Sequence, residues 1–180
     1  MRHTQLVNYA LYQIGWFGCV LGAASQRPWM GCLIGMILVG VHVALSVDRV
    51  LEVRLVVLAT AVGAAVEMIQ IAVGTYRFTS GTVYDARPPP LAARHVGAVC
   101  DDVRFSLRSV VTRPVLAVLF GAAGGPIAFL AGERLGAVTL LPPLAQSLLR
   151  LSISWAIALV VFSAVVLRIA PEGGADYRHA

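Results

Sequence analysis

The sequence predicts an all-α fold: a polytopic helical membrane bundle of about six transmembrane helices. Two observations lead to this fold class. Hydrophobic residues make up 58% of the 180-residue chain and the mean hydropathy is +0.81, whereas a soluble domain averages about 45–50% apolar residues and, when small, leaves much of its surface exposed. The apolar residues also fall in runs of about 20 residues without the alternation of a strand, and backbone groups in hydrocarbon must be hydrogen-bonded within such a run.

Five of the expected spans are clear and one is degenerate. The clear ones cover about residues 6–24, 29–47, 55–76, 114–132 and 144–169, and the degenerate one covers about 91–111. The connections are short, so neighbouring helices are expected to be antiparallel, and no room is left for a soluble domain. We therefore expect a single integral membrane domain over residues 1–170, followed by a polar C-terminal tail at 171–180.

The arginines set the expected orientation. The chain has 14 basic residues, all of them Arg, and a six-span topology places slightly more of them on the side of the N-terminus than on the opposite side. Because basic residues concentrate in cytoplasmic loops, the N-terminus is expected to be cytoplasmic. If 91–111 did not span, the C-terminus would lie on the outer side.

The expected span at 91–111 contains five ionisable groups: Arg94, His95, Asp101, Asp102 and Arg104. At a helix centre, the last three together would cost on the order of 8 kcal/mol on insertion scales. Pairing of Asp101 with Arg104, one turn later, would reduce that cost. The segment is therefore interpreted as a poor span packed against protein, as an interfacial segment with its charges outward, or as a charged relay inside the bundle.

Polar side chains inside the clear spans form the candidate intramembrane polar site, because such groups are costly in lipid and by default suggest function. The candidates are Asn8, Gln13, His42, Glu67 and Gln70. Glu67 and Gln70 lie one turn apart and share a face of their helix. For each candidate the alternative role is a structural hydrogen bond between helices.

Small residues and one proline indicate close helix packing. Gly15 and Gly22 lie on one seam of the first span, and Gly121 and Gly125 form a small-xxx-small surface. Pro126 removes a backbone hydrogen bond and is expected to kink its helix. The alternative for this glycine-rich segment is a broken helix whose carbonyls face a ligand.

The sequence contains no recognisable catalytic set. It lacks a nucleophile elbow, an HExxH motif, a phosphate loop and a GxGxxG fingerprint, and its Cys and His residues have no metal-ligand spacing. We therefore expect no catalytic residue, no metal and no cofactor, which favours a protein that is not an enzyme. The net charge of +5 is scattered between apolar blocks, so nucleic acid is not an expected partner.

Four stretches carry a family resemblance: "NYALYQIGWFGCVLGAASQRPWMG", "EMIQIAVGTYRFTSG", "RFSLRSVVTRP" and "GAAGGPIAFLAGERLGAV". Over nearly the whole chain, they resemble the bacterial inner-membrane family called domain of unknown function 2878. The resemblance implies a small multi-span membrane protein with an acidic residue at the position of Glu67, and no established activity. Genes of that family tend to lie beside genes for fatty-acyl-modifying enzymes, so the resemblance suggests a lipid-modifying enzyme as a partner.

The chain departs from the family at "LAARHVGAVCDDV", residues 91–103, where family members are strongly apolar. One choice of codons for this stretch, read one base later, gives an apolar segment without a stop codon. This supports the hypothesis of a local frame slip, lost and regained around one helix, beside the interpretation as a native span. The coding DNA decides between the two.

These features favour a non-enzymatic integral membrane protein that handles a lipid or another hydrophobic solute, or that acts as the membrane partner of a lipid-modifying enzyme. Membrane lipid is an expected partner, and a homo-oligomer is a further possibility. The alternative function is a proton-linked small-solute transporter that uses Glu67 and His42. A membrane enzyme would require His42, Glu67 and Asn8 to share one cavity.

Overall fold

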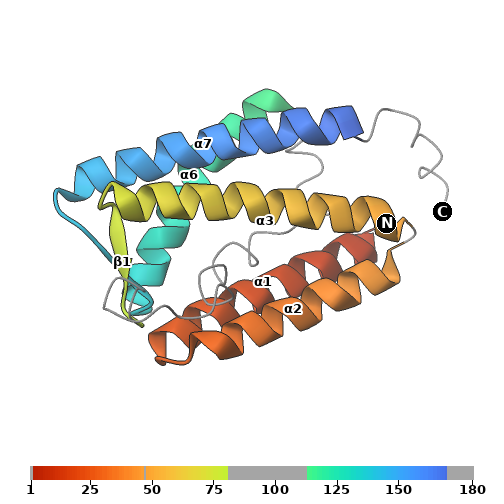
Figure 1. The fold of residues 1–180 in the computed structure, drawn as a ribbon, viewed down its shortest axis with the longest axis horizontal. Helices are drawn as coiled ribbons and strands as arrows, with labels where there is room; N and C mark the ends of the chain where they lie inside the picture. The colour runs from red at the N-terminus through yellow and green to blue at the C-terminus, as the bar shows by residue number, and fades with distance from the viewer. Residues whose placement is uncertain (1, 47, 81–112, 170–180) are drawn as a thin grey trace.

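The computed structural model describes the backbone of residues 2–46, 48–80 and 113–169, and the side chains of these ranges from Gln13 onward. Within these ranges the chain forms five helices and two short strands (Figure 1). The helices are α1 (Arg2–Ala24), α2 (Pro28–Leu45), α3 (Arg49–Ala72), α6 (Pro114–Arg134) and α7 (Leu144–Ile169). The strands are β1 (Tyr76–Phe78) and β2 (Val138–Leu140).

Each of the five helices overlaps one of the five clear spans expected from the sequence. α2, α3, α6 and α7 are each long and apolar enough to cross a membrane, and the apolar part described for α1 is shorter, Gln13–Ala24. These helices indicate a membrane protein. The expected span at 91–111, with its ionisable groups and the proposed frame slip, lies outside the described residues, as does the tail at 171–180.

α3 differs from the expected span at 55–76. It begins at Arg49 because the side chain of Asp48 accepts the backbone N–H of Leu51 at 3.0 Å and so caps the first turn. It ends at Ala72, and the residues from Tyr76 onward form β1. The all-α prediction therefore holds for the described helices but did not include the two strands.

α3 and α6 end in the same way. Gly74 and Gly136 follow these helices with φ values of +68° and +82°, a left-handed conformation that glycine adopts at little cost. After each glycine, the N–H of the next residue donates to the carbonyl five residues earlier at 2.9 Å. This is a helix C-terminal motif that satisfies the last carbonyls, and it turns each helix directly into a strand.

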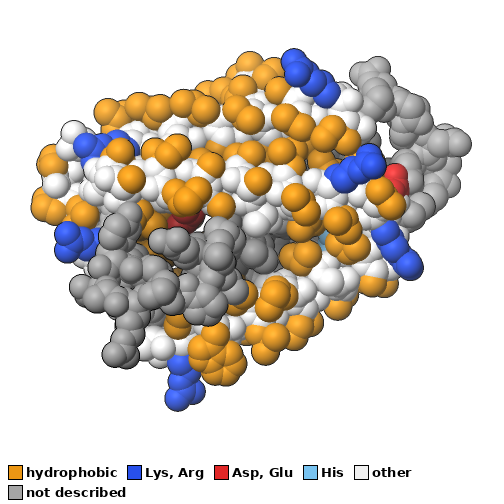
Figure 2. Space-filling view, viewed as in Figure 1, with side chains coloured by type: hydrophobic (Ala, Val, Ile, Leu, Met, Phe, Trp, Pro, Cys, Tyr) orange, Lys and Arg blue, Asp and Glu red, His pale blue; other side chains and the backbone are white. Residues whose placement is uncertain are grey.

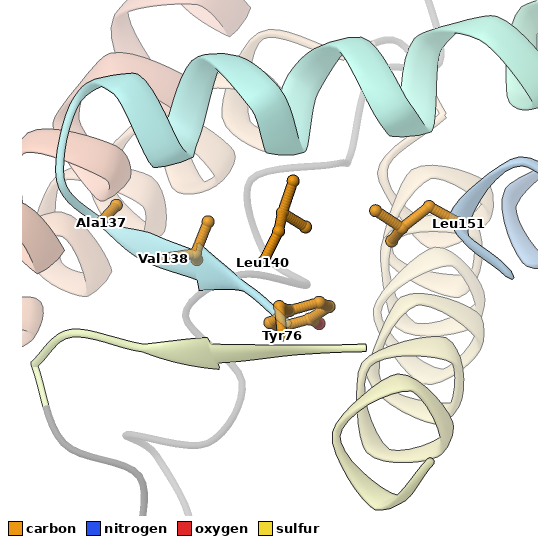
Figure 3. Close-up of a cluster of buried hydrophobic side chains, with 5 residues drawn as sticks. All are labelled: Tyr76, Ala137, Val138, Leu140 and Leu151. Carbon is orange, nitrogen blue, oxygen red and sulfur yellow. The ribbon is translucent and has the colours of Figure 1, made fainter. Parts of the chain in front are cut away.

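The two strands pair antiparallel and close one end of the bundle, called the sheet end below. Three residue pairs set the register: Tyr76 with Leu140, Arg77 with Thr139, and Phe78 with Val138. Five buried side chains form the hydrophobic core at this end (Figure 3): Tyr76, Ala137, Val138, Leu140 and Leu151. The largest cluster of buried apolar side chains among the described residues therefore lies at the sheet end, while Leu55 and Ala117 are buried elsewhere in the bundle.

The helices form two antiparallel hairpins, α1–α2 and α6–α7, with α3 between them in Figure 1 and packed against α7. The hairpins depend on small residues. A Cβ at Gly121 would overlap the backbone of Trp155, and one at Gly125 would overlap the indole ring of the same residue. In the other hairpin, Gly15 and Gly22 lie against α2. The glycines thus allow each pair of helices to approach closely.

Pro126 lies inside α6, and the helix continues through it. Because proline has no N–H, the carbonyl of Ala122, four residues earlier, lacks its usual helical donor. The hydroxyl of Ser152 on α7 donates to this carbonyl at 2.7 Å. The neighbouring helix therefore supplies the hydrogen bond that proline removes, which is how proline is tolerated in a span.

The long faces of the bundle are apolar. Figure 2 shows hydrophobic side chains along the helices, with arginine side chains near the ends. Exposed large apolar residues occur on each described helix, for example Ile14, Leu33, Val57, Leu119 and Ile157. In water such a surface would be an aggregation liability, whereas lipid chains cover it at no cost.

Candidate functional site

A cluster of polar side chains lies at the sheet end, where α3, β1 and α7 meet. We call it the sheet-end polar cluster, and its members are Glu67, Gln70, Thr75, Tyr76 and Ser154. The first four are buried, and each of the five is hydrogen-bonded to another member. Burial of so many polar groups requires that they bond to one another or to the backbone.

Glu67 is held by Tyr76. The tyrosine hydroxyl donates to Oε2 of Glu67 at 2.8 Å, while the tyrosine ring packs on Phe129 of α6 with ring centroids 4.5 Å apart. Within the described residues, this is the hydrogen bond that Glu67 makes. Tyr76, on the strand that follows α3, therefore connects α3 to α6.

Gln70 connects α3 to α7. Its Oε1 accepts the hydroxyl of Thr75 at 2.5 Å. Its Nε2 donates to the carbonyl of Arg150 at 3.0 Å and also to the hydroxyl of Ser154. Because both ends of the amide are used, the role of Gln70 is a structural tie between two spans.

His42 lies elsewhere. Its Nε2 is 3.6 Å from Oε2 of Glu52, which is buried in the first turn of α3. Glu52 and Glu67 are separated by fifteen residues of one helix, which corresponds to about 22 Å along its axis. The structure therefore places His42 and Glu67 at opposite ends of α3 and not beside one another.

The other two candidates belong to α1. Gln13 is partly buried in that helix, and the side chain of Asn8 lies outside the described residues. Of the candidate intramembrane site, the structure thus brings Glu67 and Gln70 into one cluster and His42 into a second pair with Glu52.

Sequence reasoning missed Thr75, Tyr76, Ser154 and Glu52. Thr75 and Tyr76 lie at the end of the span expected at 55–76, and neither was a candidate for the polar site. Glu52 was assigned to a connection because the third span was started too late. The available signal was the glycine that follows each helix, in "AVGTYRF" and "RLGAVTL", since glycine after an apolar helix marks its end.

The cluster contains groups that can donate and accept hydrogen bonds. The carboxyl group of Glu67 accepts a hydrogen bond from Tyr76, and the hydroxyl of Ser154 donates a hydrogen bond to the carbonyl of Arg150 at 2.8 Å. In the part of the chain that the structure describes, no group of three or more His, Cys, Asp or Glu side chains could hold a metal ion.

Apolar spans, small-residue contacts and a buried polar cluster at one end define a compact helical membrane protein of the multi-span class. The comparison with family models identifies the family. The model described as "Protein of unknown function (DUF2878)" matches residues 5–161, and the chain belongs to this family. Comparisons with curated proteins and with solved structures found no match.

Proposed function

We propose that this protein is a non-enzymatic integral membrane protein that handles a lipid or another hydrophobic solute, in its own right or as the membrane partner of a lipid-modifying enzyme. The main support is the sheet-end polar cluster on an otherwise apolar bundle. It places polar groups at one end of the spans, while many large apolar side chains are exposed along the described helices. An amphiphile has the same division between head and tail.

Photolabelling tests this function. Purified full-length protein in phospholipid vesicles is exposed in turn to a long-chain primary amine and to the matching fatty acid, each of which carries a diazirine in its alkyl chain. We expect saturable labelling that an unlabelled lipid of the same chain length competes away. Labelling that is not competed, and that equals the labelling of an unrelated multi-span protein, would overturn the proposal.

The proposed topology is six spans in the bacterial inner membrane, with the N-terminus cytoplasmic. β1 lies at the sheet end, whereas α6 begins toward the opposite end (Figure 1), which supports an odd number of crossings between them. Reporter fusions after Ser46 and after Thr79 test the orientation. Cytoplasmic reporter activity after Ser46 and periplasmic activity after Thr79 are expected, and the reverse pattern would refute it.

A second candidate function is proton-linked transport of a small solute. The observation that favours it is a buried carboxyl group near each end of α3, Glu67 at the sheet end and Glu52, beside His42, at the other. Acidic groups inside spans are typical of proton relays. Proton movement into vesicles that depends on an added solute, and that Glu67→Gln abolishes, would favour this function over the first. A Glu67→Gln protein with full transport would exclude it.

A further inference from the structure

The helix–glycine–strand units α3–β1 and α6–β2 are copies of one backbone arrangement. Their glycines, Gly74 and Gly136, are 62 residues apart (136 − 74). The strand register follows the same spacing: Tyr76 pairs with Leu140, and the residues 62 positions away from them, Val138 and Phe78, pair with one another. The register of the two strands is therefore symmetric about the pair Arg77–Thr139.

The hydrogen bonds between the two units obey the same relation. The N–H of Leu141 donates to the carbonyl of Thr75 at 3.0 Å, and the N–H of Thr79 donates to the carbonyl of Ala137 at 3.0 Å. Each pair of atoms is converted into the other by a shift of 62 residues. The backbone of the sheet end is thus symmetric.

The polar cluster is not symmetric. The residues that correspond to Glu67, Gln70, Thr75 and Tyr76 are Phe129, Gly132, Ala137 and Val138. The unit α6–β2 therefore builds the same helix end and the same strand with none of these polar side chains. The backbone of this motif does not require a carboxyl group at the position of Glu67, whose hydrogen bond within the described residues goes to Tyr76.

Glu67 also differs from its neighbours within the cluster. Gln70, Thr75 and Tyr76 are each 2% exposed or less, whereas Glu67 is 7% exposed. The Tyr76 hydroxyl engages Oε2, and among the described residues Oε1 receives no hydrogen bond. Of the two carboxyl oxygens of Glu67, Oε1 is therefore the acceptor that the described residues leave unused.

We propose that Glu67 binds the head group of an amphiphile that donates hydrogen bonds, such as an ammonium or hydroxyl head, while the alkyl tail lies against the apolar helix faces. A carboxyl oxygen accepts hydrogen bonds, so Glu67 can take one from an ammonium or hydroxyl head, whereas an ionised carboxylate head has no donor to offer it. This inference deepens the proposed lipid handling and depends on it.

Two photoreactive probes with the same diazirine-bearing alkyl chain test the inference: a long-chain primary amine, whose head has only donors, and the matching carboxylic acid. Both are applied to the full-length protein in vesicles. We expect amine labelling to exceed acid labelling. We also expect Glu67→Leu to weaken amine binding by about tenfold or more, as loss of a charge-assisted hydrogen bond does, and Glu67→Gln to weaken it less. Acid labelling should stay as it is.

Glu133→Gln is the matched control. Oε1 of Glu133 accepts the backbone N–H of Leu140 at 2.8 Å at the same end of the bundle, and a glutamine oxygen can accept the same bond. This variant should label as the unmodified protein does. Gel filtration in detergent verifies that each variant is folded.

The outcomes separate the two proposals. If both probes give competed labelling and Glu67→Leu leaves that labelling unchanged, the head-group assignment is overturned, while the proposed lipid handling still holds. Absence of competed labelling by either probe would overturn both. Labelling lost equally in Glu67→Leu and Glu133→Gln would show a general effect of charge at the sheet end, and would also overturn the assignment to Glu67.

Discussion

The hydrogen bond from Ser152 to Ala122 predicts an energetic coupling between Ser152 and Pro126. In the unmodified protein the serine hydroxyl is the neighbouring-helix donor to the carbonyl that the proline leaves without its helical partner. Replacing Pro126 by alanine restores a backbone N–H at that position, so the carbonyl regains an intrahelical donor. The serine hydroxyl is then no longer needed.

The expected size follows from the contact. The bond is 2.7 Å long and partly buried between two spans, where an unsatisfied carbonyl costs about 1–3 kcal/mol and measured interhelical bonds average about 0.6 kcal/mol. We therefore expect Ser152→Ala to lower the free energy of unfolding by about 1–2 kcal/mol. In the Pro126→Ala background the same change should cost less than about 0.5 kcal/mol, which gives a coupling energy of about 1 kcal/mol.

The assay is a double-mutant cycle. The unmodified protein, the two single variants and the double variant are unfolded with sodium dodecyl sulfate in mixed micelles, and helix content is followed by circular dichroism. The cycle cancels effects of each substitution that do not involve the other. If Ser152→Ala costs the same in both backgrounds, the serine does not replace the bond that proline removes, and the reasoning is refuted.

Two further contacts give predictions in the same unfolding assay. Gly121→Ala places a Cβ within the backbone of Trp155 and should lower the free energy of unfolding by about 1–3 kcal/mol. Gly124→Ala is the control and should be neutral, because no neighbouring atom is nearer than 4.0 Å. Equal stability of the two variants would contradict the close helix contact. Tyr76→Phe keeps the packed ring and removes the hydrogen bond to Glu67. It should therefore lower the free energy of unfolding by about 0.5–2 kcal/mol. An unchanged unfolding midpoint would contradict that hydrogen bond.

The helices could be predicted because the bilayer imposes a length and an apolar composition that a single sequence displays directly. Pro114 marked the start of α6, and the structure begins that helix there. Glu67 and Gln70 were singled out because a polar group in an apolar run is costly whatever its partner. The structure brings both into one cluster.

The partners of these groups could not be predicted. β1 and β2 have three residues each, too few to display an alternating pattern, and they pair across a gap of about sixty residues that no local signal bridges. Tyr76 therefore could not be predicted as the hydrogen-bond partner of Glu67. The partner of His42 depended on the first turn of α3, because only the cap at Asp48 brings Glu52 into the helix.

The position of the carboxyl groups along α3 also bears on function. Glu52 lies in the first turn and Glu67 within the last two turns, while the middle of the helix carries small and apolar residues such as Gly63. A carboxylate at the centre of a span costs about 2.5–3.5 kcal/mol, and the cost falls toward the interfaces. Glu67 therefore lies nearer to one end of α3 than to its centre, where the cost of a carboxyl group in a span is smaller.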